Sequence, residues 1–125
     1  MRLYRGLKGP YRAKDVPAGR LHWTDFTDCP YTALAYAASR RGVVLVLDVP
    51  ADAGLRVTEE TWPGQETRRL LVWGGFDRWV AAVIAAKDLR AEVRRKGVSR
   101  LRPGDKGVVL EQAIARRLQS HAGVV

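Results

Sequence analysis

The amino-acid sequence predicts an α+β fold, a small single domain of mostly antiparallel strands with a helix after the second strand. Three observations support this prediction. The segment Val43 to Val49 is β-branched and almost entirely apolar, which is typical of a buried strand. Residues 30–41 before it contain four Ala, two Tyr and one Leu, which favours a helix. Two further apolar runs, residues 70–73 and 79–84, flank a Gly-Gly pair that predicts a turn between two strands.

The first strand is predicted over residues 1–7, and Gly9 and Pro10 end it. A loop rich in Gly, Pro and basic residues leads to a second strand, predicted over residues 21–24. Thr27 or Asp28 is then expected to cap the helix, because these side chains accept a hydrogen bond from a first-turn N–H.

The helix is expected to run to about Arg41, with Gly42 in the left-handed conformation that often follows a helix. The strand 43–49 ends at Pro50, and a loop is expected to carry the acidic stretch that follows. Residues 87–96 are predicted as a short helix or an extended edge, and residues 108–120 as an amphipathic helix.

Length and composition limit the classes of protein. A chain of 125 residues has room for one domain with a modest core, and 46% hydrophobic and 28% charged residues are typical of globular proteins. No apolar run approaches the roughly 20 residues of a membrane span. The N-terminal residues lack the apolar core of a secretory signal. The predicted location is therefore cytoplasmic, in the producing cell or in a target cell that receives the chain as an effector.

Positive charge gathers in the last third of the chain, which has a formal net charge of +9. Residues 87–102 hold seven basic residues against two acidic ones. Such a block could bind nucleic acid or an acidic partner, although it lacks the interleaved aromatic residues that stack on bases. A solvated charged surface is the plainer interpretation. The domain is predicted to span residues 1–125, with a basic helical extension from about residue 87.

Several common catalytic sites are absent from the sequence. No glycine-rich loop matches a dinucleotide fingerprint or a P-loop, and no Gly-x-Ser-x-Gly elbow is present. Cys29 is the one cysteine, so no internal disulfide can form, and a small buried role is favoured over a nucleophilic one. Two histidines do not make a histidine-rich metal site, and no metal is predicted.

Three polar signals remain, and they follow one another along the chain. Arg5 lies in the first strand, beside Gly6, whose missing side chain would allow a ligand to approach closely. Thr24 ends the second strand directly before the helix, and the glutamates Glu59 and Glu66 flank a Trp-Pro-Gly turn. An arginine can neutralise a diphosphate, and a carboxylate can stabilise the cation formed when a glycosidic bond breaks. The order therefore suits a site that cleaves a pyrophosphate-bearing nucleotide glycoside.

This order resembles the ADP-ribosyltransferase superfamily. The stretches LYRG, WTDFTDCPYTALAYA with the following GVVLVLDVP, and VTEETWPGQETR carry the resemblance, which covers roughly residues 3 to 84. It is most similar to the small rifamycin ADP-ribosyltransferase type, with an arginine opening the first motif. The resemblance implies a split β-sandwich, NAD as co-substrate, no metal, and transfer of ADP-ribose to an unidentified protein, nucleic acid or small molecule, as in enzymes and NAD-cleaving toxins.

The resemblance also implies site residues. Arg5 falls on the first-strand histidine of the rifamycin type, Thr24 on its strand Thr, and His22 or Trp23 on its Tyr. Tyr31 is expected to form a wall for the ligand. The residues predicted to bind NAD are Tyr4, Arg5, Gly6, His22, Trp23, Thr24 and Tyr31.

Two glutamates compete for the catalytic role beside Arg5. Glu59 falls on the acidic residue before the Phe-Pro-Gly turn of the rifamycin type. The branch that opens with arginine instead expects a glutamate leading into a strand, which favours Glu66. Glu60 should point away from Glu59 in an extended segment. Tyr36, five residues after Tyr31, is predicted to face the core.

Two other classes of function stay open. One is a non-enzymatic module that binds nucleic acid through residues 87–102 and the C-terminal helix. The other is a catalytically inactive relative that keeps the fold and acts in protein interaction.

Overall fold

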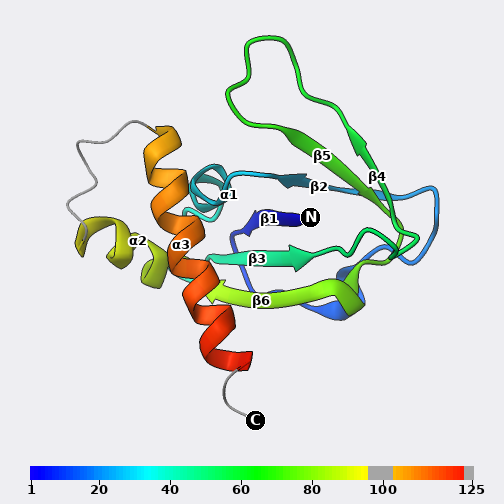
Figure 1. The fold of residues 1–125 in the computed structure, drawn as a ribbon. Coiled ribbons are helices and arrows are strands. Elements are labelled where there is room, and N and C mark those ends of the chain that lie inside the picture. Colours follow the sequence, from blue (N-terminus) through cyan, green and yellow to red (C-terminus); the bar gives the residue numbers. More distant parts are fainter. Residues whose placement is uncertain (96–102, 123–125) are drawn as a thin grey trace.

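The computed structural model describes residues 1–95 and 103–122. Within these residues the chain forms a six-stranded antiparallel sheet and three α-helices, which confirms the α+β class (Figure 1). The strands are β1 (Arg2–Leu7), β2 (Trp23–Thr27), β3 (Val43–Asp48), β4 (Arg56–Glu59), β5 (Arg69–Trp73) and β6 (Val80–Ala85). The helices are α1 (Pro30–Tyr36), α2 (Ala86–Arg95) and α3 (Pro103–Ala122), with short 3-10 turns at Ala13–Asp15 and Asp77–Trp79.

The sheet consists of two well-paired halves. Its strand order is β4-β5-β2-β1-β3-β6. β1 pairs with β3 over its whole length, and β2 pairs with β5 in the same way. β1 and β2, however, meet at one Cα pair, Tyr4 with Thr27. The halves β4-β5-β2 and β1-β3-β6 therefore join at a single point, which we call the β1–β2 junction.

The first core cluster lies where the three helices pack on the sheet. Val44 and Val46 of β3 point into it, because alternate residues of a strand share one face. Leu110 and Ile114 lie four residues apart on α3 and are fully buried, as is Leu89 of α2. Burial of a side chain of this size contributes about 2 kcal/mol. The helices of the predicted basic extension are thus part of the core.

The second core cluster lies on the opposite face of the sheet. Leu45 and Leu47 of β3 point into it, next to Leu3 of β1. Phe26 of β2 and Phe76, which follows β5, pack edge to face with ring centroids 5.1 Å apart. Parts of the loops around residues 11–16 and 53–55 pack against this cluster, so β3 is buried on both faces.

The elements around α1 differ from the sequence prediction. β2 begins at Trp23, two residues later than expected, and continues to Thr27. Cys29, without a side-chain capping bond, precedes α1, and α1 ends at Tyr36 instead of near Arg41. Gly42 is not left-handed, since the positive φ angles in the described chain belong to other glycines.

The early end of α1 has a packing cause. A Cβ on Gly42 would lie 2.0 Å from the carbonyl oxygen of Ala37, so the chain turns back tightly against the end of the helix. The Gly42 carbonyl then accepts a hydrogen bond from Ala86 N at 2.9 Å. β3 can therefore start at once, between β1 and β6.

The second half of the sheet also corrects two predictions. Residues 56–59, expected within a loop, form the edge strand β4, which pairs with β5. The Gly-Gly turn does not join a hairpin, because β5 and β6 lie in different halves of the sheet. Gly74, with φ +83°, donates its N–H to the His22 carbonyl, and the buried Phe76 leads the chain onto the second cluster.

The C-terminal elements agree with the helical prediction. For residues 87–96 the sequence allowed either a short helix or an extended edge. The described part of this segment is helical, as α2 shows. α3 begins at Pro103 and ends at Ala122, so it is longer than the predicted 108–120. Lys96 and the rest of the basic block up to Arg102 lie outside the described residues.

Gly6 has a different role from the predicted one. A Cβ at this position would lie 1.9 Å from the Ala33 carbonyl oxygen and 2.9 Å from the Tyr36 Cβ. The backbone that approaches Gly6 is therefore that of α1. The glycine allows the helix to lie directly on β1, and it places the end of α1 beside the β1–β2 junction.

We expect Gly6→Ala to lower the free energy of unfolding by about 3 kcal/mol, because the added methyl overlaps backbone that cannot move aside easily. Urea denaturation would measure the change. Gly9→Ala is the matched control, since nothing lies within 4 Å of a Cβ there. Equal stability of the two variants would contradict the packing role of Gly6.

Candidate functional site

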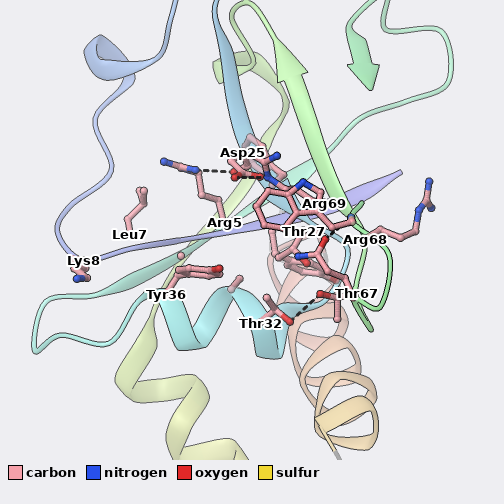
Figure 2. A pocket seen from close by; sticks show the side chains of 16 residues that line it. Arg5, Leu7, Lys8, Asp25, Thr27, Thr32, Tyr36, Thr67, Arg68 and Arg69 are labelled. Carbon is pink, nitrogen blue, oxygen red and sulfur yellow. Dashed lines mark hydrogen bonds and ion pairs between the residues drawn. The ribbon is translucent and has the colours of Figure 1, made fainter. Parts of the chain in front are cut away.

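A cavity of about 560 Å³ opens where β1 and β2 separate. We call it the front groove. Residues of β1, β2 and α1 form its floor and one side, and the loop between β4 and β5 forms the other side (Figure 2). The polar and aromatic residues that line it are Tyr4, Arg5, Lys8, Asp25, Phe26, Thr27, Thr32, Tyr36, Trp62, Gln65, Thr67, Arg68 and Arg69.

Arg5 crosses the opening between the two halves of the sheet. Its Nη1 donates a hydrogen bond of 2.7 Å to the backbone carbonyl of Asp25, as Figure 2 shows. Partial burial lowers the pKa of the guanidinium below its ordinary value, and the Asp25 carboxylate opposes this shift. Within the described chain, Arg5 forms no ion pair. The guanidinium therefore retains N–H donors for an anion.

Asp25 and Arg69 face each other on neighbouring strands. Arg69 Nε lies 3.0 Å from Asp25 Oδ2, and the Arg69 guanidinium also lies 5.6 Å from the centre of the Trp23 ring. Asp25 is the one carboxylate among the residues that line the front groove, against four basic side chains. Four positive charges minus one negative charge leave the lining at +3, which favours an anionic ligand.

The loop between β4 and β5 contains a tight turn at Trp62-Pro63-Gly64-Gln65. Gln65 N donates to the Trp62 carbonyl at 3.1 Å, and Gly64 has φ +88°, as a Pro-Gly type II turn requires. The Gln65 side chain accepts a second bond from Trp62 N at 2.9 Å. Both contacts hold Trp62 in place at the edge of the groove.

The same loop is attached to α1 and to the segment between β2 and α1. Arg68 N donates to Asp28 Oδ1 at 3.0 Å, and the hydroxyls of Thr32 and Thr67 are 3.4 Å apart. Arg69 N donates to Thr61 Oγ1 at 3.1 Å. The wall that the loop forms is thus connected to the opposite side of the groove at several points.

The two helix tyrosines have exchanged the roles predicted for them. Tyr36 is 69% exposed and lines the groove, whereas Tyr31 packs against the first core cluster. Lys106 of α3 lies over the Tyr31 ring, 5.1 Å from its centre. The reason is the short α1, because its last residue faces the opening while its first turn faces α3.

The predicted catalytic glutamates do not line the groove. Glu59, at the end of β4, accepts hydrogen bonds from Arg68, with Nε and Nη2 each 2.7 Å from Oε1. These bonds, and a further one from Thr61, lower the pKa of Glu59. Glu66 is exposed on the loop and also lies outside the groove lining. In Figure 2, Arg68 extends away from Arg5.

The predicted ligand-binding residues fall into three groups. Tyr4, Arg5 and Gly6 line the front groove, although Tyr4 is 2% exposed and Gly6 mainly contacts α1. Trp23 and Thr24 line a second cavity that also contacts Arg5. His22 and Tyr31 line neither cavity. Trp23 is 45% exposed, and its ring lies beside Arg69 on the face of β2 that carries Asp25.

Several lining residues were missed by the sequence prediction, above all Asp25, Tyr36 and Arg69. The alternation along β2 was the available signal. Once the strand is extended to Thr27, Asp25 and Thr27 share the face opposite Phe26, toward α1. Arg69 stands opposite Thr27 in the register of β2 and β5.

Comparisons with known proteins find no relative of this chain. No family model, no curated protein and no solved structure matches the chain. Among residues 1–95 and 103–122, no group of three or more His, Cys, Asp and Glu side chains could hold a metal ion. None of the described helices is both long and apolar enough to cross a membrane.

Tyr4 gives a test of the groove floor. Burial, and next the charge of Glu111, raise its pKa to about 12 from an ordinary value of 10.0. The neutral form is favoured in the folded state, so its stabilisation is complete below pH 10 and is lost as the pH rises toward about 12.

We expect Tyr4→Phe to resemble the wild type near neutral pH and to lose less stability than the wild type above pH 10, because the phenylalanine cannot ionise. Urea denaturation of both proteins across this range would measure the difference. The same alkaline loss in both would show that Tyr4 does not resist ionisation.

Proposed function

We propose that the front groove binds NAD and that the protein cleaves its nicotinamide–ribose bond, transferring ADP-ribose to an acceptor or to water. The environment of Arg5 is the observation that carries the proposal. Its guanidinium lies half-buried in the groove, bonds to a backbone carbonyl, and has no carboxylate partner in the described chain. A diphosphate matches the fork of donors that such a guanidinium offers.

The size and the aromatic walls of the groove support a dinucleotide. Sites for ligands of drug size measure roughly 300–1,000 Å³, and the groove has about 560 Å³. Tyr36 and Trp62 line it from different elements, with 69% and 65% of their surface exposed. Exposed rings of this kind offer faces on which the flat rings of a nucleotide can stack.

The finer fold prediction, a split β-sandwich of the ADP-ribosyltransferase type, belongs to the same proposal. Two three-stranded halves that meet at one Cα pair support it. The position of α1 directly after β2 also agrees with that type. NAD would then lie where the two halves separate.

In the proposed reaction, the C–N bond between nicotinamide and ribose breaks. Its electron pair goes to the ring nitrogen of nicotinamide, which loses its positive charge, and an oxocarbenium-like cation develops on the ribose. A nucleophilic atom of the acceptor then bonds to the ribose carbon and loses its proton to solvent. A carboxylate near the ribose would stabilise the cation, and Arg5 would hold the diphosphate.

Three carboxylates are candidates for the stabilising role. Asp25 is favoured by position, because it alone of the three lines the groove. Glu59 is favoured by the resemblance, but it is bound to Arg68 outside the groove lining. Glu66 lies on the loop before β5, outside the groove lining.

The proposal predicts that purified protein binds NAD and releases nicotinamide. We expect Arg5→Gln to weaken NAD binding about tenfold or more, because a charge-assisted contact to the diphosphate is lost. Arg78→Gln is the matched control, since Arg78 is exposed and lines neither cavity. Calorimetric titration would measure binding. No NAD binding, or no turnover with any acceptor tested, would overturn the proposal.

The same assay separates the carboxylates. We expect Asp25→Asn to reduce nicotinamide release at least about 100-fold, with NAD binding changed little, because it removes a charge needed mainly in the transition state. Glu59→Gln and Glu66→Gln should keep most of the activity. If Glu59→Gln or Glu66→Gln abolishes release and Asp25→Asn does not, the assignment to Asp25 is wrong. Thermal unfolding of each variant controls for folding, because Asp25 also pairs with Arg69.

A second candidate function is binding of nucleic acid or of an acidic protein without chemistry. The exposed basic residues Lys87 and Arg94 lie seven positions apart on α2, close to two helical turns, and so share a side of the helix. Arg90, between them, is half-buried and reaches the Ser39 carbonyl at 3.4 Å.

This function predicts that binding of a single-stranded oligonucleotide weakens steeply with salt and survives Arg5→Gln. Replacing Lys87 and Arg94 together with Gln should weaken it at every sequence tested, because contacts to phosphates carry no sequence information. Fluorescence anisotropy at several salt concentrations would measure the slope. A salt-independent affinity, or an affinity unchanged in the double variant, would exclude α2 as the binding surface.

A further inference from the structure

A second cavity of about 490 Å³ adjoins the front groove and extends to the face of the sheet that carries the second core cluster. We call it the reverse pocket. The two cavities share the lining residues Arg5, Leu7, Lys8 and Asp25. The loop that follows β1 covers the reverse pocket with Tyr11 and Val16, and the first residues of β2 form its side. Its floor consists of Leu45 and Phe76, which are 1% and 3% exposed.

Arg5 reaches both cavities because of its place in β1. It alternates with Tyr4, so its side chain starts on the face that carries the second core cluster. Opposite it in the register stands Leu45, part of the floor of the reverse pocket. The guanidinium then extends to the Asp25 carbonyl at the opening between the strands. Arg5 therefore borders both cavities.

The remaining lining is aromatic and nearly balanced in charge. Tyr11 contributes a phenol ring whose hydroxyl donates to Asp77. The backbone of β2 borders the pocket at Trp23, whose ring lies toward Arg69 on the face of β2 opposite Phe26. The charged residues that line the pocket are Arg5, Lys8, Arg12, Asp15 and Asp25. Three positive charges minus two negative charges leave +1, compared with +3 in the front groove.

We propose that the reverse pocket binds a flat aromatic molecule with one acidic group, its ring between Tyr11 and the Leu45–Phe76 floor and its acid on Arg5. A lining of +1 suits one negative charge, whereas the front groove suits a more highly charged ligand. Apolar walls with a few placed polar groups are typical of small-molecule sites. The inference does not rest on NAD binding, because the pocket and its test involve no nucleotide.

The probe for the test is 1-naphthalenesulfonate, with 1-naphthalenemethanol as its uncharged counterpart. We expect the sulfonate to saturate one site with a Kd on the order of 1 mM or tighter. The alcohol should bind about tenfold more weakly, because it lacks the charge that Arg5 recognises. Backbone amide NMR shifts should change mainly in residues 8–24 and around Phe76, which border the pocket.

Variants separate the two cavities. We expect Tyr11→Ala to weaken sulfonate binding about fivefold and Arg5→Gln about tenfold. Tyr36→Ala is the control, since Tyr36 lines only the front groove, and it should leave binding unchanged. Because Arg5 also spans the β1–β2 junction, Tyr11→Ala and the alcohol test the site without altering that contact.

Three results would overturn the proposal. They are no saturable binding of the sulfonate, equal affinity for the sulfonate and the alcohol, or binding that Tyr36→Ala removes while Tyr11→Ala does not. Shift changes confined to residues 60–69 would likewise place the probe in the front groove.

Discussion

The hydrogen bond from Arg5 to the Asp25 carbonyl crosses the one place where the sheet is not held by a full ladder. β1 and β2 share a single Cα pair, and beyond it the strands part toward Gly6 and Asp25. A side chain thus stands where backbone pairing would otherwise continue. Both cavities open at this point, so their shapes depend on how far the two halves of the sheet separate. Each half is itself well paired, which keeps the separation local.

Close packing of α1 determines what the front groove contains. Neither Gly6 nor Gly42 has room for a Cβ, because the backbone of α1 and the turn after it lie against both. The helix therefore lies on β1 and ends after two turns, with Tyr36 at the opening. A longer helix would have carried the chain away from β3 before that strand could pair. The absence of a side chain at Gly6 and Gly42 thus determines where Tyr36 lies.

The sequence predicted the fold better than the site. Strands with strong apolar character, such as Val43 to Val49, were found because burial on both faces leaves an obvious pattern. β4 was missed because an edge strand with Arg, Thr and Glu has no such pattern.

For the site, Arg5 was predicted as a ligand-binding residue because a charged residue inside a strand is conspicuous, and it does line the front groove. Asp25 and Tyr36 were missed as groove residues, because their positions depend on how far β2 extends and on where α1 ends. The alternation along β2 places Asp25 on the groove face only once the strand is known to reach Thr27. The sequence shows that Glu59 and Glu66 flank a turn, but it cannot show that Arg68 forms an ion pair with Glu59.

The doubly bonded turn at Trp62 has a consequence for affinity. The turn is closed by the backbone and again by the Gln65 side chain, and the loop is attached to Asp28 and Thr32. Its conformational entropy is therefore lost on folding, not on contact with a ligand. A molecule that packs against Trp62 would meet a preorganised surface and would lose little of its binding free energy to ordering the protein.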